Sequence, residues 1–302
     1  MSGRVTIAVR PGRPLAAGAV VAGPGRVGDG GGMTEERFDT WAAGDAYERY
    51  MGRWSRAVAA EFVAWLHAAP GLRWVDAGCG TGALTAAVVA RCRPGWVLGL
   101  DRSAAFVARA RAEVPAPAGF VVADAMAPPL RDGACDVVVS GLVLNFLPAP
   151  AAAVARAARV VRPGGTVAGY VWDYAEGMGF LRYFWAAAGA VDPAAERWDE
   201  GRRFARCRPD RLRACWERAG LADVAVVPIE VATGFAGFAD LWEPFLAGQG
   251  PAPGYVAALS RPDRDRLRET LRASVPTRAD GSIVLGARAW AIRGGRPGRA
   301  HG

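Results

Sequence analysis

Three alternating glycines mark a short segment that could bind a nucleotide. Residues 75–82 read Val-Asp-Ala-Gly-Cys-Gly-Thr-Gly, which puts Gly78, Gly80 and Gly82 directly after an apolar run. Because glycine has no Cβ, it accepts positive φ and lets a ligand lie directly on the backbone. Residues 83–91 are good helix formers, and the free amides at a helix N-terminus favour a carboxylate or another anion. The segment therefore predicts a strand, a tight turn beneath a flat ligand, and a helix.

An acidic residue ends each of the next two predicted strands. Asp101 closes the run 96–100, where a carboxylate at a strand tip can accept both hydroxyls of a ribose. Dehydrogenases and methyltransferases both use that device, so Asp101 does not separate them. Asp124 closes the run 119–123 and can accept a hydrogen bond from an exocyclic adenine amine. This second acid favours an adenosine-containing ligand other than a nicotinamide dinucleotide.

Two later segments complete a pattern. Residues 135–146 read Cys-Asp-Val-Val-Val-Ser-Gly-Leu-Val-Leu-Asn-Phe, and residues 161–167 read Val-Arg-Pro-Gly-Gly-Thr-Val. With the glycine turn and the two acids, they resemble the class I S-adenosylmethionine-dependent methyltransferases, specifically the type 11 group of small-molecule enzymes. The resemblance covers about residues 40–293. It implies S-adenosyl-L-methionine as the cofactor.

The resemblance also implies which residues bind that cofactor. Its methionine portion would lie over the glycine turn, with Asp76 orienting the amino group directly or through water. Its ribose would lie on Asp101, and Gly141 and Asn145 would border the site of methyl transfer. The implied cofactor-binding residues are Asp76, Gly78, Cys79, Gly80, Gly82, Asp101, the four around the adenine (Arg102, Asp124, Ala125, Met126), Gly141, Asn145, and Tyr47 and Tyr50.

The last two tyrosines belong to the segment 33–70, which the resemblance implies is a helical lid over the cofactor. Tyr47, Tyr50 and Trp54 lie at i, i+3 and i+7, which is equally the spacing of a helix face packed on a core. Arg53 is a further candidate for contact with the cofactor or the acceptor. The sequence leaves both interpretations open.

Catalysis of methyl transfer needs little from the protein, because the sulfonium of the cofactor is already activated. If a hydroxyl acceptor needs a general base, Asp173, Tyr174 and Glu176 directly after the fifth predicted strand are the candidates. Aromatic residues are frequent in two predicted insertions, 173–208 and 235–275, and they suit a small apolar or aromatic acceptor. For any single ring, a place in a small helical core is the stronger expectation.

Residue types that are missing exclude several classes of enzyme. All 37 basic residues are arginine, so a P-loop lysine, a pyridoxal Schiff base and a Tyr-x-x-x-Lys dehydrogenase are excluded. With only two histidines, histidine-based metal sites and Ser-His-Asp chemistry are not expected. No Asn-Pro-Pro-Tyr motif follows the fourth strand, which disfavours methylation of DNA bases. A nicotinamide-dependent oxidoreductase and a non-catalytic cofactor-binding accessory protein remain as alternatives.

Composition indicates an ordinary globular chain in a reducing compartment. Its 302 residues include five cysteines without a C-x-x-C pair, which is typical of reduced thiols and predicts a cytoplasmic protein. Most of the net charge of +8 lies in the Gly/Pro-rich ends, residues 1–32 and 293–302, so we expect no nucleic-acid partner. No apolar run approaches the length of a membrane span. The oligomeric state is left open.

Strands that alternate with helices predict a doubly wound α/β sheet. The resemblance refines this to a seven-stranded Rossmann-like sheet, mostly parallel with a C-terminal antiparallel strand. The predicted domains are a disordered extension at 1–32, the lid at 33–70, a methyltransferase domain at 71–293 that carries the two insertions, and a disordered tail at 294–302. The predicted strands are 72–77, 96–100, 119–123, 134–140, 165–172, 222–231 and 282–292.

Overall fold

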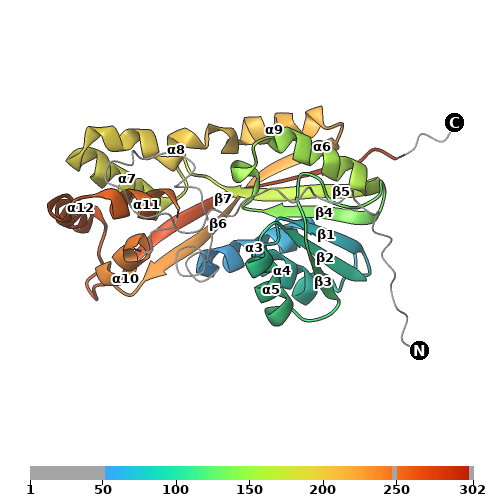
Figure 1. The fold of residues 1–302 in the computed structure, drawn as a ribbon, viewed down its shortest axis with the longest axis horizontal. Helices are drawn as coiled ribbons and strands as arrows, with labels where there is room; N and C mark the ends of the chain where they lie inside the picture. The colour runs from blue at the N-terminus through green and yellow to red at the C-terminus, as the bar shows by residue number, and fades with distance from the viewer. Residues whose placement is uncertain (1–51, 247–249, 299–302) are drawn as a thin grey trace, which may run out of the picture.

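The computed structural model describes residues 52–246 and 250–298, and its centre is one seven-stranded sheet (Figure 1). The strand order is β3-β2-β1-β4-β5-β7-β6. Only β7 runs opposite to the other six strands, so the predicted fold class is confirmed. The strands are β1 (Arg73–Ala77), β2 (Trp96–Asp101), β3 (Ala118–Val122), β4 (Cys135–Gly141), β5 (Val161–Trp172), β6 (Ala222–Phe235) and β7 (Ile283–Gly295).

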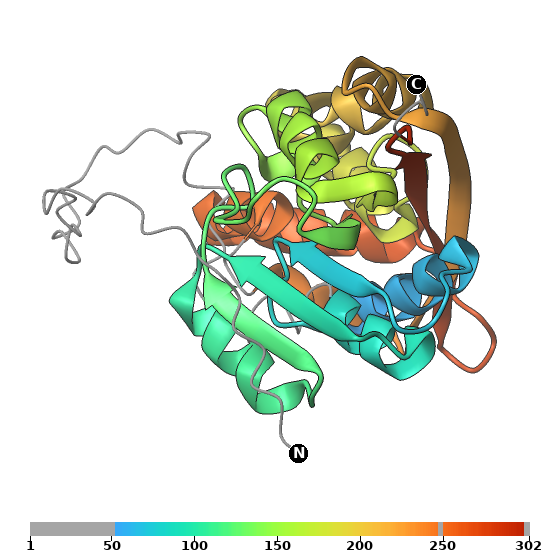
Figure 2. The ribbon, with the colours of Figure 1, turned by 90° about the vertical axis from the view of Figure 1, so that its right-hand side faces the viewer.

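Helices cover both faces of the parallel strands (Figure 2). On one face lie α3 (Arg53–Leu66), α4 (Ala83–Cys92) and α5 (Ala104–Glu113), and on the other lie α6 (Pro150–Val160) and α9 (Pro209–Arg218). This double cover explains why the central strands are mostly apolar instead of alternating, although each of β1 and β4 also buries one aspartate. In β4, for example, every residue from Cys135 to Val139 is buried.

The antiparallel strand distinguishes this sheet from a dinucleotide-binding one. A dinucleotide-binding sheet continues in parallel through its sixth strand, whereas here β7 inserts antiparallel between β5 and β6. β6 is an edge strand, and Pro228 within it pairs with Trp290 of β7. A proline is tolerated there because only one side of an edge strand needs backbone donors.

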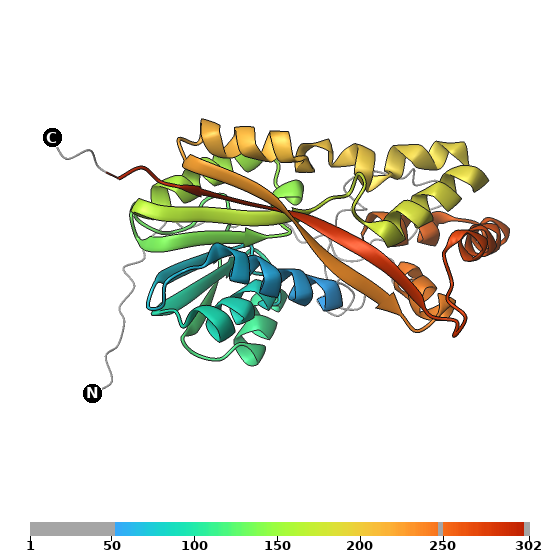
Figure 3. The ribbon, with the colours of Figure 1, turned by 180° about the vertical axis from the view of Figure 1, so that it is seen from behind.

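Both C-terminal strands are longer than predicted. β6 continues to Phe235 and β7 to Gly295, and their ladder runs without a shift from Ala225–Arg293 to Phe235–Ile283. The far half of this strand pair leaves the parallel strands and passes beneath the inserted helices (Figure 3). Alternating burial along β7 is consistent with one face packed and the other more exposed.

The two insertions pack together as one helical lobe. The first forms α7 (Gly179–Val191), η3 (Pro193–Trp198), α8 (Glu200–Arg203) and η4 (Ala205–Cys207). The second forms α10 (Phe238–Trp242), η5 (Glu243–Leu246), α11 (Pro251–Ala258) and α12 (Arg261–Ser274). Phe184 of the first insertion stacks on Phe245 of the second, with ring centroids 4.4 Å apart, and both rings are fully buried. These rings therefore form the core of the lobe.

Helix α3 buries one face against the sheet, and its first turn contacts the lobe. Val58 and Phe62 are fully buried, and Trp54 packs against Phe180 and Phe235 with ring centroids 4.8 and 5.5 Å apart. Trp54 thus serves as core. The predicted contacts of Tyr47 and Tyr50 lie outside the described residues, as does the side chain of Arg53.

Candidate functional site

A cavity of about 200 Å³ opens at the C-terminal ends of β1, β2 and β4. Ligands in doubly wound sheets bind at this edge, beyond the carboxyl ends of the strands. The cavity is lined by turns from several strands, by Ser55 of α3 and by Phe106 of α5. The predicted residues that line it are Gly78, Cys79, Gly80, Asp101 and Gly141.

The glycine turn after β1 forms the floor of the cavity. Gly78, Gly80 and Gly82 all have positive φ, at 82°, 53° and 94°. An added Cβ would meet Val143 at 2.6 Å from Gly78 and Val114 at 2.8 Å from Gly82, so those two glycines are required by close packing. At Gly80 an added Cβ would meet nothing within 4 Å. Gly80 is therefore the point where the bare backbone faces open space that a ligand can fill.

Asp101 is fixed by two backbone amides. Its Oδ2 accepts from the amide of Gly80 at 3.0 Å, and its Oδ1 accepts from the amide of Ser103 at 2.8 Å. Ser103 in turn caps α5 by accepting from Phe106 at 3.3 Å. Each carboxylate oxygen keeps a further lone pair. The side chain is therefore pre-oriented at the cavity wall and still able to accept from ligand hydroxyls.

Asp76 lies behind the glycine turn instead of on the cavity wall. It is fully buried, and its Oδ2 accepts from the hydroxyl of Thr85 at 2.7 Å. Burial raises the pKa of Asp76 to about 7. Its Oδ1 is buried without a hydrogen-bond partner among the described residues. A buried acceptor in that state favours an incoming donor, such as an ammonium group or a bridging water.

The side chain of Cys79 packs into a small apolar cluster with Val107 and Phe120. Burial raises the pKa of the Cys79 thiol far above its ordinary value. A thiol in this state is not a nucleophile at neutral pH. Cys79 therefore contributes to the site through its place in the turn.

The residues predicted around an adenine lie beside Asp101 but not on the cavity wall. The amide of Ala123 donates to the carbonyl of Asp101 at 2.9 Å, which joins the segment after β3 to the end of β2. Asp124 is half-buried and its Oδ1 accepts from the amide of Met126 at 2.9 Å. Arg102 is exposed, and Ala125 lines a separate void of about 30 Å³ on the α6 side of the sheet.

Gly141, at the end of β4, and Asn145, in the turn that follows, lie at two different sites. Gly141 lies on the ring of Tyr170, its partner in the β4–β5 ladder, and an added Cβ would fall 2.6 Å from the tyrosine oxygen. Asn145, in the turn η2 (Leu144–Phe146), does not line this cavity. Its Nδ2 donates to the hydroxyl of Tyr174 at 3.4 Å.

The three candidate bases lie away from the cavity. Asp173 is buried and its Oδ2 accepts from Nε of Arg288 at 2.8 Å. The exposed carboxylate of Glu176 is 3.6 Å from Nη2 of the same arginine. Tyr174 is buried, with its ring centroid 4.8 Å from that of Phe204. Arg288 therefore forms ion pairs with Asp173 and Glu176 just after the end of β5, outside the cavity.

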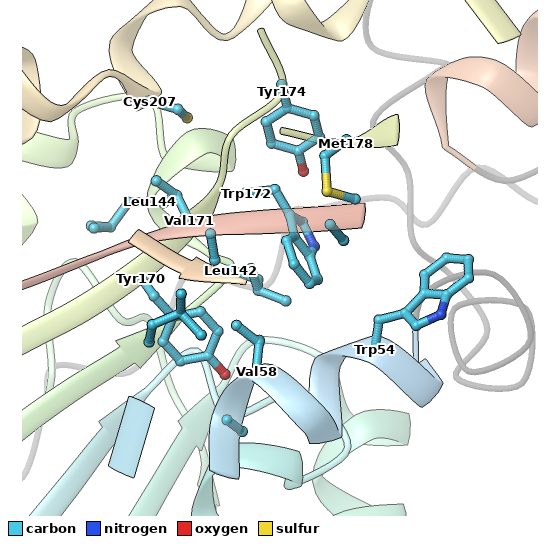
Figure 4. Close-up of a cluster of buried hydrophobic side chains, with 14 of the residues drawn as sticks. Trp54, Val58, Leu142, Leu144, Tyr170, Val171, Trp172, Tyr174, Met178 and Cys207 are labelled. Atoms are coloured by element: carbon cyan, nitrogen blue, oxygen red, sulfur yellow. The ribbon is translucent and has the colours of Figure 1, made fainter. Parts of the chain in front are cut away.

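Tyr170 is a cavity residue that sequence analysis did not place among the cofactor-binding or catalytic candidates. Figure 4 shows Tyr170 and Trp172 on the side of β5 that faces Trp54 and Val58, whereas Val171 lies near Leu144. Tyr170 is 2% exposed and lines the cavity with Leu142, Val143 and Phe146. The feature that identifies Tyr170 is its pairing with Gly141 on the neighbouring strand. This pairing cannot be recognised in the sequence before the strand register is known.

The sequence and the fold both match known methyltransferases. Residues 75–169 match the family model described as "Methyltransferase domain". The biotin biosynthesis bifunctional protein BioCD of Bordetella avium is 37% identical over 138 residues, which are 44% of this chain and 29% of that protein. A trans-aconitate 2-methyltransferase of Methylobacterium radiotolerans is 39% identical over 94 residues, 31% of this chain and 35% of that protein. The chain thus spans about a third of the length of these relatives.

A solved structure shows the same fold. Phosphoethanolamine N-methyltransferase 2 of Haemonchus contortus, in complex with phosphomonomethylethanolamine and S-adenosylhomocysteine, superposes with a TM-score of 0.52 at 17% identity. The match covers 84% of this chain and 57% of that protein. In the part of the chain that the structure describes, every helix falls short of what a membrane crossing requires. Residues 75–169 thus match a methyltransferase domain, and the fold of the chain is shared with a solved methyltransferase.

Proposed function

We propose that this protein transfers a methyl group from S-adenosylmethionine to a small-molecule acceptor. One observation carries the proposal: the cavity at the C-terminal edge of the sheet combines the bare backbone of Gly80 with the oriented carboxylate of Asp101. A bare glycine backbone lets a ligand approach closely, and a strand-end carboxylate binds a ribose. S-adenosylmethionine can place its methionine chain over the glycines and its ribose on the carboxylate.

The remaining cofactor contacts follow the chain around the cavity. The methionine portion would lie over residues 78–82, where the orphaned Oδ1 of Asp76 suits its ammonium group directly or through water. The ribose would bind Asp101. The adenine would lie toward the segment 123–126, which adjoins Asp101 through a backbone hydrogen bond. The exposed Arg102 would cover it from the solvent side.

The residues of the cavity suit an acceptor that brings its own nucleophile. The sulfonium of the bound cofactor supplies an activated methyl group. Among the described residues that line the cavity, Cys79, Asp101 and Tyr170 are titratable, and the first two lie at the turn and at the ribose position. At the Tyr170 end, the described residues of the lining include neither a carboxylate nor a histidine that could remove a proton. The protein therefore acts by orienting the nucleophile and by excluding water.

The wall near Tyr170 is apolar, with Leu142, Val143 and Phe146 beside the ring. Such a wall favours an acceptor with an apolar or aromatic body. The trans-aconitate methyltransferase relative suggests a carboxylate as one class of nucleophile to test, and a neutral amine is another that needs no base.

Calorimetry with the purified chain tests the cofactor. S-adenosylmethionine and S-adenosylhomocysteine should bind, whereas NAD and NADP should not; this preference agrees with the antiparallel β7, which differs from the dinucleotide-binding order. Binding of a nicotinamide cofactor alone would refute the proposal.

A turnover assay tests the chemistry. Release of S-adenosylhomocysteine should depend on an added acceptor from a panel of trans-aconitate, aromatic carboxylates and aromatic amines. If the cofactor binds but no member of a broad acceptor panel is methylated, the chain is a non-catalytic cofactor-binding protein.

A further inference from the structure

Phe146 lines the cavity proposed for the cofactor, and its ring has no role in packing the sheet. At this end of the cavity, Leu142 and Tyr170 are 9% and 2% exposed, so both are spent on the core. Val143 packs on the glycine turn, where a Cβ added to Gly78 would meet it at 2.6 Å. Phe146 is only half-buried. Among the described residues of this wall, its ring is the large surface most open to a ligand.

The turn η2 directs Phe146 into the cavity. Leu144 and Asn145, the first two residues of the turn, are buried on the other side of β5, where they line a separate cavity of about 170 Å³ with Val171. A 3-10 turn has three residues per turn, so successive side chains lie about 120° apart and the third points away from the first two. The amide of Phe146 donates to the carbonyl of Val143 at 2.9 Å and closes the turn. The two anchored side chains therefore fix the direction of the third.

Phe204 of the lobe sets the orientation of this ring. The two ring centroids are 5.6 Å apart and the ring planes meet at 78°, which is an edge-to-face pair. Phe204 is itself 7% exposed and held from two sides. Its ring centroid lies 4.8 Å from that of Tyr174, and its amide donates to the carbonyl of Glu200 in α8 at 2.8 Å. The lobe is thus connected to the cavity wall through a pair of aromatic rings.

The sheet order separates Phe146 from the residues proposed to bind the cofactor. Asp101 ends β2 and the glycine turn follows β1, whereas Phe146 follows β4 on the other side of β1. Phe106, a second half-buried ring of the lining, belongs to the β2 side, because its amide donates to the hydroxyl of Ser103 at 3.3 Å. The proposed cofactor contacts therefore leave the Phe146 end of the cavity to the acceptor.

We propose that Phe146 determines which acceptor is bound, by stacking on a flat, unsaturated molecule, and that Phe204 is the positioning residue that fixes its ring. The inference rests on the proposed methyl transfer and narrows its acceptor to aromatic or conjugated compounds. A flat molecule contacts a ring over its whole face, and the contact is stronger than the buried apolar area alone provides. A saturated ring of the same size is puckered and loses part of that contact.

Matched pairs of flat and saturated compounds test this preference. The pairs are phenol with cyclohexanol, and benzamide with cyclohexanecarboxamide, so each pair shares its polar group and differs in the ring. They are neutral because the described lining at the Phe146 end carries no charged side chain. Each compound is titrated by ligand-observed NMR into the full chain saturated with S-adenosylhomocysteine. The flat member of at least one pair should bind about two- to tenfold more tightly than its saturated partner.

Variants assign the preference to the ring. Phe146→Leu should abolish it by weakening the flat compounds alone, whereas Phe146→Tyr, which keeps a ring, should retain it. Phe204→Leu should reduce the preference in part, and a general loss of stability cannot do this, because it would weaken both members of a pair equally. Phe106→Leu should keep the preference. Phe238→Leu is the matched control outside the cavity: this half-buried ring of the lobe stacks on Trp242, and the variant should bind every probe as the wild type does.

Calorimetry with S-adenosylhomocysteine alone distinguishes a failure of this inference from a failure of the proposed function. If the product does not bind, the proposed function is wrong and the inference fails with it. If the product binds, four results overturn the inference alone. They are no binding of phenol and benzamide, equal affinities within both pairs, a preference that survives in Phe146→Leu, and its loss in Phe238→Leu. If Phe204→Leu does not fold, the two variants of the half-buried Phe146 decide the question.

Discussion

Nε of Arg288 lies 2.8 Å from Oδ2 of Asp173, so a carboxylate that the sequence offered as a general base forms a partly buried ion pair. The backbone repeats the link, because the amide of Asp173 donates to the carbonyl of Arg288 at 2.9 Å. The pair joins the end of β5 to β7. Its role in the structure is therefore to hold the antiparallel strand against the parallel sheet.

Asp173→Asn should consequently affect stability and not cofactor binding. We expect the free energy of unfolding in urea to fall by about 1–3 kcal/mol, because the partly buried guanidinium of Arg288 loses its shortest charged hydrogen bonds. Glu176→Gln is the matched control: its side chain is 79% exposed, and a change within about 0.5 kcal/mol is expected. Loss of turnover by Asp173→Asn at unchanged stability would instead identify a reacting group.

Gly80→Ala should separate ligand contact from backbone strain. The added methyl group would occupy open space in the cavity, so S-adenosylhomocysteine should bind at least about tenfold more weakly. The positive φ of 53° costs about 1–2 kcal/mol of stability in addition. Gly220→Ala is the control, because Gly220 also has a positive φ of 77° and open space around it but lies far along the chain after α9. It should show a similar loss of stability and unchanged affinity in calorimetry; equal affinity loss in both variants would remove Gly80 from the site.

Asp101→Ala should weaken S-adenosylmethionine binding by roughly ten- to a hundredfold, because two charge-assisted hydrogen bonds to the ribose are lost. The amides of Gly80 and Ser103 lose their acceptor too, so a modest drop in stability should accompany the effect. Asp124→Ala should weaken binding less, since an adenine amine is a neutral donor. Calorimetry on both variants checks the order, and wild-type affinity in Asp101→Ala would contradict the assigned ribose position.

Glu200 should make stability fall as pH rises. It is 2% exposed, it accepts from the indole of Trp185, and burial raises its pKa from 4.5 to about 7. The folded state therefore keeps a proton that the unfolded chain releases, so its stabilisation is complete below about pH 4.5 and is lost as pH rises through about 7.

Glu200→Gln should remove up to about 2 kcal/mol of the difference in unfolding free energy between pH 5.5 and pH 8, measured in urea. A smaller slope of the same sign should remain in the variant, because the pKa of buried Asp76 is also raised to about 7. Glu196→Gln, on the exposed surface, should follow the wild-type profile. Parallel profiles for wild type and Glu200→Gln would show that Glu200 does not titrate in this range.

Local pattern was enough to predict the parallel half of the fold. The run before Gly78 became β1, and residues 134–140 became β4 within one residue, because strands buried on both faces are apolar without interruption. The position of Asp101 beside the glycine turn could also be predicted, because the carboxyl ends of parallel strands share one edge of the sheet. The glycine turn and Asp101 are the two features on which most of the sequence-based prediction of the cofactor depends.

Non-local contacts could not be predicted in this way. Arg288 pairs with Asp173 across 115 positions of sequence, and nothing local to either residue indicates the other. Asn145 and Phe146 are neighbours in a single 3-10 turn, yet they line different cavities on the two sides of β5. The insertions were predicted separately, whereas the stacking of Phe184 on Phe245 makes them one lobe.

The uninterrupted β6–β7 ladder determines how the lobe can move. Its pairs run from Ala225–Arg293 beside the parallel strands to Phe235–Ile283 beneath the inserted helices, without a bulge between them. A hinge needs a few residues that absorb large changes in φ and ψ, and a paired ladder offers none without breaking hydrogen bonds. This strand pair therefore couples the lobe to the sheet along its whole length, and a swing of the lobe would have to bend the pair or break its hydrogen bonds.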